Sequence, residues 1–269
     1  MKKILPVLLI LFSMPPLWGQ QSLQSLIGAE KAFASYADSL GVKAAFVSYL
    51  GDSGMIFTPK PTLGKPFYQN LSNISGKLYW HPTYAVVSAG SDIGFTTGPY
   101  VFKPTEKDSS SWRWGHFTSI WQKQADDSWK NVADFGSPHT ALSAHTPIAY
   151  PASYALTPLK RKNEKATKAG LLETDKAYTS NAPYLSPGTA IYREGQYPRF
   201  EAAGELLKQE NQQYSLWQPL YAAVGKAGDF GYTYGHYSTK SGNKGYYLRI
   251  WQMQPQGWKL LLESLNQEK

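Results

Sequence analysis

The chain has 269 residues, of which 42% are hydrophobic and 17% charged, and its 27 basic and 19 acidic residues give a net charge of +8. This composition is too apolar for a disordered chain, and the length favours two domains. Because there is no cysteine, a disulfide scaffold, a thiol nucleophile, a lipoprotein anchor and cysteine-ligated zinc or iron–sulfur sites are excluded.

The N-terminus predicts a secretory signal peptide. Lys2 and Lys3 precede an apolar run at residues 4–14, which is too short for a membrane span because a span takes about 20 apolar residues. No later stretch has that length either. We therefore assign residues 1–19 to a signal peptide and expect an exported protein without a membrane span, in the bacterial periplasm or outside the cell.

Helices are expected first and strands after them. Apolar spacing predicts helices and one short strand, in the order helix 22–40, helix 42–50, strand 55–57 and helix 64–70. A run of predicted strands follows, at 77–88, 93–102, 112–124 and 129–135. This order indicates an α+β architecture. One antiparallel sheet that curves around the N-terminal helices would form a cone with a cavity, which is a common location for ligand sites.

An internal repeat relates the two halves of the chain. Residues 80–100 align with residues 217–237 without a gap, and 10 of the 21 positions are identical. A second block, residues 115–124, matches residues 245–254 at the same place in the other half. Self-similarity of this kind predicts two copies of one domain.

The segment between the copies is rich in proline. Proline at this density disfavours both a helix and a central strand, so we interpret the segment as a connector. The predicted boundaries are 20–137 for domain 1, 138–162 for the linker and 163–269 for domain 2. Basic residues gather at 160–168. In an exported chain we interpret this run as solvated linker surface, and we expect no nucleic-acid partner.

Each copy carries four strand motifs in the same order: Trp-x-Pro, a glycine-rich turn and strand, Gly-x-x-x-x-x-Trp, and a closing Trp-Lys strand that ends in an acid. They lie at 80–82, 92–98, 115–121 and 129–134 in copy one, and at 217–219, 228–235, 245–251 and 258–263 in copy two. This pattern resembles a family of unknown function in the nuclear transport factor two-like (SnoaL-like) cone-fold superfamily. The resemblance covers most of the chain after the signal peptide.

The resemblance implies two tandem cone-shaped domains, each with N-terminal helices packed against a curved antiparallel sheet. It also implies a cavity and a sheet through which the two copies pair as an internal pseudo-dimer. It does not imply a reaction, because the superfamily includes isomerase-like and dehydratase enzymes, polyketide cyclases, and many non-catalytic binding or association domains.

Two residues are candidates for catalysis, because enzymes of this fold place a carboxylate or histidine base against a hydrogen-bond donor in an apolar pocket. Asp134 ends one strand and corresponds to Glu263, whereas His116 corresponds to Tyr246. Strand alternation puts His116 on one face with Trp112, Trp114 and Thr118, but does not tell which face lines the cavity. The alternatives are a hydrogen-bonded, partly buried histidine and a strand-end carboxylate that pairs with lysine or backbone N–H groups.

The aromatic candidates for ligand binding are Trp80, Tyr84, Trp112 and Trp114. Core packing is the alternative for the repeated tryptophans, and edge-strand packing is the alternative for the unrepeated pair at 112 and 114. Asp92 and Asp229 lie between glycines and are interpreted as turn residues. The five histidines lack the spacing of metal ligands, and there is no nucleophile elbow, phosphate loop or dinucleotide motif. We therefore expect no metal and no cofactor.

Three hypotheses remain. The first is an exported protein that binds a small hydrophobic or aromatic molecule in a cone cavity. The second is an acid–base enzyme (an isomerase, dehydratase or hydrolase-like catalyst) that uses domain 1, and the third is an association module with filled cavities. An acid beside a tyrosine or histidine in an open cavity would favour the enzyme, and an aromatic plug would favour the module. The sequence leaves open whether the chain forms a further homodimer.

Overall fold

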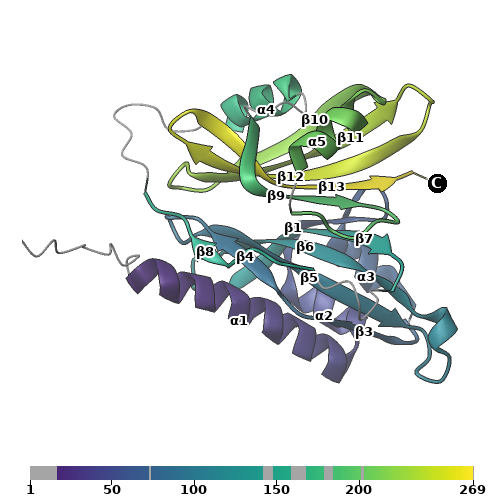
Figure 1. Ribbon diagram of the computed structural model, residues 1–269. Coiled ribbons are helices and arrows are strands. Elements are labelled where there is room, and N and C mark those ends of the chain that lie inside the picture. The colour runs from purple at the N-terminus through teal and green to yellow at the C-terminus, as the bar shows by residue number, and fades with distance from the viewer. Residues whose placement is uncertain are drawn as a thin grey trace, which may run out of the picture.

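The computed structural model describes residues 17–72, 74–141, 148–158, 168–178, 184–200 and 203–268. Most of the predicted signal peptide and all of the basic cluster except Lys168 lie outside the described residues. Figure 1 shows two layered halves, each with a sheet and helices on its outer side. Within the described residues, no helix is long and apolar enough to cross a membrane.

Domain 1 combines three helices with a mostly antiparallel sheet. The helices are α1 (Leu17–Leu40), α2 (Val42–Tyr49) and α3 (Gly64–Asn70). The strands are β1 (Leu50–Phe57), β2 (Pro61–Leu63), β3 (Lys77–Trp80), β4 (Tyr84–Val87), β5 (Ile93–Lys103), β6 (Arg113–Lys123) and β7 (Trp129–His139). A short 3-10 helix, η1 (Ser109–Ser111), lies between β5 and β6. The strand order is β2-β1-β7-β6-β5-β4, with β3 also paired to β5 and with β1 parallel to β7.

Helix α1 forms because its apolar residues recur every three or four positions. Leu23, Leu26, Phe33 and Ala37 are all buried, and they face the sheet of domain 1. The helix ends before Gly41, whose φ of 88° lies in the left-handed region that glycine adopts without strain. Helix α1 begins at Leu17, five residues before the predicted helix and ahead of the predicted end of the signal peptide.

Domain 2 repeats this plan in a smaller form. Its helices are α4 (Lys168–Ala177) and α5 (Ala203–Asn211). Its strands are β9 (Leu185–Arg193), β10 (Tyr214–Val224), β11 (Phe230–Thr239), β12 (Lys244–Gln254) and β13 (Gly257–Gln267), in the order β10-β11-β12-β13-β9. As in domain 1, the first strand pairs in parallel with the last one. The predicted α+β class with two tandem cone domains is confirmed.

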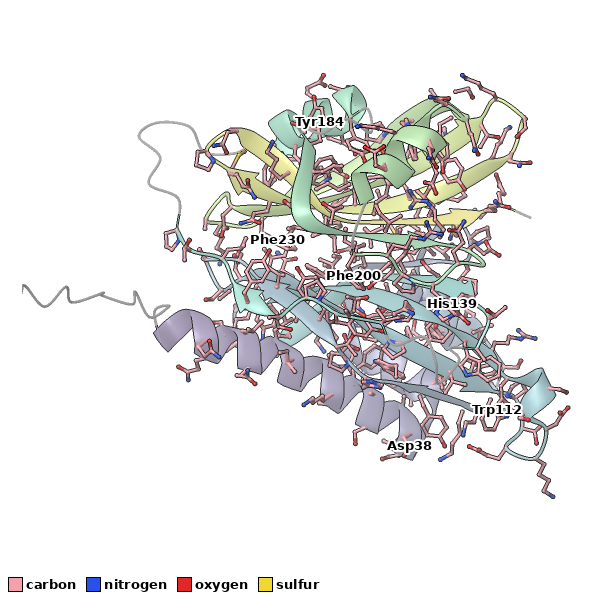
Figure 2. All side chains as sticks on the ribbon, in the orientation of Figure 1. Asp38, Trp112, His139, Tyr184, Phe200 and Phe230 are labelled. Carbon is pink, nitrogen blue, oxygen red and sulfur yellow. The ribbon has the colours of Figure 1, made fainter. Side chains whose placement is uncertain are left out.

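The two sheets pack face to face through one shared hydrophobic core. Phe95 of β5 stacks on Phe230 of β11 with ring centroids 6.3 Å apart, and Phe57 of β1 meets Tyr234 of β11 edge to face. Figure 2 shows Phe200 and Phe230 between the two layers. Each sheet therefore has one face toward the other domain and one face toward its own helices.

Two aspartates of the repeat join the domains reciprocally. Asp92 Oδ2 accepts a hydrogen bond from the backbone N–H of Lys226 at 2.9 Å, and Asp229 Oδ2 accepts one from the N–H of Ala89 at 2.6 Å. In the repeat alignment, Asp92 matches Asp229 and Ala89 matches Lys226. Contacts that exchange in this way are those of a two-fold axis. The aspartates lie in turns, as expected, and they also connect the copies.

The connector contributes an edge strand. Residues Tyr154 and Ala155 form β8, which pairs in parallel with Val86 and Val87 of β4. A proline-rich segment can occupy such a position because an edge strand needs hydrogen-bond donors on one side only.

Candidate functional site

A cavity of about 170 Å³ lies between the helices of domain 1 and its sheet. Every layer of the domain contributes to its wall, and most of the wall is aromatic. The lining residues are Phe33, Phe46, Tyr68, Leu78, Trp80, Tyr100, Phe117, Ser119, Asp134 and Gly136. Among these lining residues, Asp134 is the only one with a carboxyl group, and none has a basic side chain.

Strand alternation aims Asp134 into this cavity. Its neighbours Ala133 and Phe135 belong to the core between the sheets, so Asp134 points to the helix side. Ser119 Oγ and Asn131 Nδ2 donate to Asp134 Oδ2 at 2.8 and 2.9 Å. Among the described residues, no donor is bonded to Oδ1. This oxygen remains available to a molecule in the cavity.

Burial controls the proton affinity of Asp134. It raises the pKa of the carboxyl from 3.8 to about 6, although the hydrogen bonds from Ser119 and Asn131 act in the opposite direction. A carboxyl with this pKa is mostly ionised at neutral pH and can still accept a proton readily. This is the property that a general base needs.

Two phenols share the cavity with Asp134. Burial, and next the negative charge of Asp134, raise the pKa of Tyr100 to about 12 and that of Tyr68 well above its usual value. Both hydroxyls therefore keep their protons and can donate hydrogen bonds. The ring of Tyr100 lies over Gly115, where any Cβ would collide with it. The glycine is needed for this close approach.

The corresponding space in domain 2 is filled. The repeat places Arg249 where domain 1 has Ser119, and Glu263 where it has Asp134. Arg249 is fully buried and bonds to Glu263 at 2.7 Å and to Asp175 at 2.8 Å. Its guanidinium also lies 4.2 to 4.3 Å from the ring centroids of three aromatic residues, Trp217, Tyr178 and Tyr247.

The negative charge of Glu263 in this filled space is compensated by two arginines. Burial alone would raise the pKa of Glu263, but Arg249 and Arg193 lower it below the usual value. Arg193 reaches Glu263 at 2.6 Å and Glu210 at 2.7 Å. The equivalent acid of domain 1, Asp134, has no ion pair among the described residues. Of the two aligned sites, the one in domain 1 is open and uncompensated.

His116 lies on the other face of the sheet. It is buried between the two domains, where Nδ1 lies 2.7 Å from Nε2 of His139 and Nε2 bonds to the hydroxyl of Tyr150. His139 Nδ1 contacts the carbonyl of Thr140, which can only accept, so His139 donates there and accepts from His116. The Tyr150 hydroxyl then donates to His116 Nε2.

Burial, and next His139 and His81, lower the pKa of His116 to about 3. His116 is therefore neutral at physiological pH, which agrees with this chain of hydrogen bonds. The structure does not bring His116 and Asp134 together, because they lie on opposite faces of one sheet.

The aromatic candidates separate into three places. Trp80 lines the cavity. Tyr84 lies in the core between the sheets, against Phe95. Trp112 and Trp114 line an open groove of about 490 Å³ beside His139, and Figure 2 shows Trp112 at the outer end of domain 1.

Sequence reasoning missed several residues of the cavity, chiefly Ser119 and the two phenols. Tyr100 carried a signal, since it repeats as Tyr237 together with the glycine beneath it. The alignment shows arginine in domain 2 (Arg249) where domain 1 has serine (Ser119). This difference can be interpreted only when both side chains are known to face the helices of their own domain. Tyr68 on α3 carried no signal. In the described residues, no group of three His, Asp or Glu side chains is placed to hold a metal ion.

Comparisons with known proteins find similarity to solved structures only. No family model and no curated protein matches the chain. A nuclear transport factor 2-like superfamily protein from Salmonella enterica is 10% identical, with a TM-score of 0.36, over 48% of this chain and 99% of its own.

Two further solved structures are similar to the same extent. A nuclear transport factor 2-like protein of unknown function from Shewanella oneidensis is 16% identical, with a TM-score of 0.32, over 44% of this chain and 98% of its own. A ketosteroid isomerase-like protein from Erwinia carotovora is 15% identical, with a TM-score of 0.33, over 43% of this chain and 95% of its own. Each of these structures is similar to about half of this chain at low sequence identity.

Proposed function

We propose that domain 1 binds a small, uncharged, largely apolar molecule in its cavity and that Asp134 accepts a proton from it. One observation carries this proposal: a buried carboxyl with a pKa of about 6 keeps one oxygen free in an aromatic cavity. Among the described residues, no basic side chain lines this cavity. An anionic ligand would therefore meet the charge of Asp134 without compensation.

The polar groups suit a proton transfer next to a carbonyl group. Asp134 Oδ1 would take a proton from a carbon or oxygen atom of the ligand, and the negative charge that develops on the carbonyl oxygen would be stabilised by a hydroxyl of Tyr68 or Tyr100. The apolar wall excludes water, which strengthens both interactions. An acid–base reaction on a neutral carbonyl compound is the chemistry that these residues support best.

Two probes test this proposal. Binding of 2-naphthol, a neutral aromatic molecule, is measured by fluorescence, and hydrogen–deuterium exchange of 2-cyclohexenone in D2O is followed by NMR. We expect the protein to bind naphthol and to accelerate the exchange, and we expect Asp134→Asn to lower the exchange rate by about 10² to 10⁴-fold while naphthol still binds. A wild-type protein that binds no naphthol and accelerates no exchange would overturn the proposal.

Domain 2 is proposed to be a scaffold without a ligand. The observation in its favour is the plug formed by Arg249 and its partners. This assigns the third hypothesis, a filled module, to one half of the molecule only. The wild type should therefore bind one naphthol per chain, and a stoichiometry of two per chain would contradict this proposal.

Export and self-association are further proposals. The basic and apolar N-terminal residues support secretion, and N-terminal sequencing of the protein purified from its host would test it: an intact Met1 would contradict cleavage. The shared core already covers the inner face of each sheet, so we propose that one chain is the functional unit. Sedimentation equilibrium would show a monomer, and a stable dimer would contradict this.

A further inference from the structure

A second carboxyl group, Glu30 of α1, is buried directly behind the cavity wall. Its side chain is fully buried and receives three hydrogen bonds, from Trp80 Nε1 at 2.6 Å, from Trp121 Nε1 at 2.8 Å and from the hydroxyl of Thr96. An indole nitrogen can only donate. The Thr96 hydroxyl also accepts from Trp121, so its own proton points to Glu30. All three bonds therefore require an acceptor at Glu30, which the carboxylate form provides.

Glu30 connects this buried network to the cavity through Trp80. The indole of Trp80 is only half buried and lines the cavity, and its N–H bonds to Glu30 Oε1. Phe33, one turn after Glu30 on the same helix, packs edge to face on Trp80 with centroids 4.9 Å apart. One turn of α1 thus positions two adjacent aromatic residues of the cavity wall. Glu30 holds Trp80 by a hydrogen bond, and Phe33 is part of the helix itself.

The hydrogen bond between the buried acid and the tryptophan is present in domain 1, which has the open cavity, and not between the aligned residues of domain 2 that the structure describes. The repeat aligns Glu30 with Asp175 and Trp80 with Trp217. Asp175 accepts from Tyr247 at 2.6 Å and from Arg249, and no hydrogen bond joins it to Trp217 among the described residues. Trp217 instead lies over the guanidinium of Arg249. Where the cone is plugged, the acid pairs with the arginine, and where it is open, the acid holds the tryptophan.

The surroundings of Glu30 bring its pKa close to neutral pH. Burial, and to a smaller extent the charge of Asp134 on β7, raise the pKa of Glu30 to about 7, while its three donors lower it. Two lysines on elements that pack against α1 have other partners, since Lys43 of α2 bonds to the Leu71 carbonyl and Lys77 of β3 pairs with Asp38. Four phenols of the described residues also pack on this side: Tyr36, Tyr49, Tyr68 and Tyr100. The pKa values of Tyr49, Tyr68 and Tyr100 are raised by burial.

We infer that Glu30 is a positioning residue of the cavity: its carboxylate fixes the indole of Trp80 in the wall, so that binding in the cavity depends on the ionisation of Glu30 as well as that of Asp134. This inference rests on the proposed function of domain 1. Protonation of Glu30 removes the negative charge from the group that accepts the Trp80 N–H bond. A hydrogen bond to a neutral carboxyl is weaker than one to a carboxylate, so Trp80 is held less firmly. Binding therefore weakens as the pH falls through the titration of Glu30.

The anchoring is tested by NMR of the tryptophan indole N–H groups in the full chain. The signal of Trp80, assigned with Trp80→Phe, should move with pH near neutrality in the wild type and should not move in Glu30→Gln. In Asp134→Asn its midpoint should shift to lower pH, because a negative charge has been removed. Trp217 is the internal control. A Trp80 signal that is constant in the wild type, or that titrates unchanged in Glu30→Gln, would overturn the inference.

The effect on the site is tested with 2-naphthol between pH 5 and 9. Glu30→Gln should bind about tenfold more weakly than the wild type at pH 8, because one hydrogen bond to a charged acceptor is lost, and its affinity should no longer change near pH 7. If Glu30→Gln does not fold, Trp80→Phe keeps a ring in the wall, lacks the donor and should lose the same pH dependence.

The outcomes separate the two proposals. If the wild type binds naphthol and Glu30→Gln has the same affinity and pH profile, the role of Glu30 is wrong while the proposed function stands. If the wild type binds no naphthol, the proposed function and the coupling to binding both fail, and the NMR titration alone decides whether Glu30 anchors Trp80.

Discussion

Replacing Asp134 by asparagine should make the protein more stable at neutral pH. Burial raises the pKa of this carboxyl from 3.8 to about 6, so the folded state binds the proton more tightly than the unfolded state does. The stabilising effect of that proton is complete below about pH 4 and is lost as the pH rises through 6. With about 1.4 kcal/mol for each pH unit, the ionised carboxyl costs the fold about 3 kcal/mol at pH 7 and above.

Asparagine removes this cost and keeps the local geometry. Its side-chain oxygen can accept the hydrogen bonds from Ser119 and Asn131 that Asp134 Oδ2 now receives. The free energy of unfolding should therefore increase by up to about 3 kcal/mol at pH 7 and by almost nothing at pH 4. Urea unfolding followed by tryptophan fluorescence at several pH values between 4 and 8 measures both the gain and its pH dependence.

The matched control is Glu263→Gln, the same chemical change at the aligned position of domain 2. Glu263 is paired with Arg249 and Arg193, and breaking a buried ion pair by removing one partner costs about 3 to 5 kcal/mol. The two substitutions should therefore change stability in opposite directions. A loss of stability in Asp134→Asn at pH 7, or a gain that does not depend on pH, would refute the assignment of Asp134 as a buried, uncompensated carboxyl.

Three further predictions concern the cavity and the interface between the domains. Ser119→Arg should plug the cavity as Arg249 plugs domain 2, so that calorimetry with 2-naphthol detects no binding while the melting temperature is unchanged or higher. Because the pKa of His116 lies near 3 in the folded state, this residue should contribute a loss of stability from pH 6.5 downward, by at most about 1.4 kcal/mol per pH unit and opposite in sign to the contributions of Asp134 and Glu30. His116→Phe should remove this contribution in the same urea series, and a pH profile parallel to that of the wild type would contradict it. Asp92→Ala and Asp229→Ala should each lower the free energy of unfolding by about 1.5 to 3 kcal/mol, since each removes a charge-assisted hydrogen bond between domains; losses under 0.5 kcal/mol would mean that these bonds do not hold the copies together.

The repeat made the fold predictable. Local patterns in one copy could be checked against the other, and the aligned motifs correspond to paired strands at the same register in both sheets. The helix at Gly64–Asn70 was predicted from local residue preferences. The strand predicted at 77–88 divides into β3 and β4, because Pro82 lies between them and cannot donate to a strand ladder. What the repeat could not give was the packing of the two copies, because Asp92 and Asp229 look like ordinary turn residues until the turns are placed side by side.

The candidate site was harder to predict because strand alternation defines two faces without telling which one meets the helices. The choice of His116 with Trp112 and Trp114 selected the face that packs on domain 2. Asp134 was found because it is the acid that both copies keep late in the repeat, as Asp134 and Glu263, and Trp80 was found because it begins the repeat in both copies. Glu30 was aligned with Asp175 from the sequence, but its role depends on which donors surround it, and these come from β3, β5 and β6.

The asymmetry of the two copies has a physical reason. A cavity with uncompensated carboxyl groups is unfavourable for folding, since both the empty space and the buried charges lower stability. In domain 1 these features are retained at Asp134 and Glu30, the two residues to which the proposed function assigns a role. In domain 2 the equivalent acids, Glu263 and Asp175, are neutralised by arginine, and aromatic rings complete the plug. Because both sheets share one core, the stability of the filled copy also supports the open one. Duplication thus allows one cone to keep a destabilising site that a single copy would have to stabilise alone.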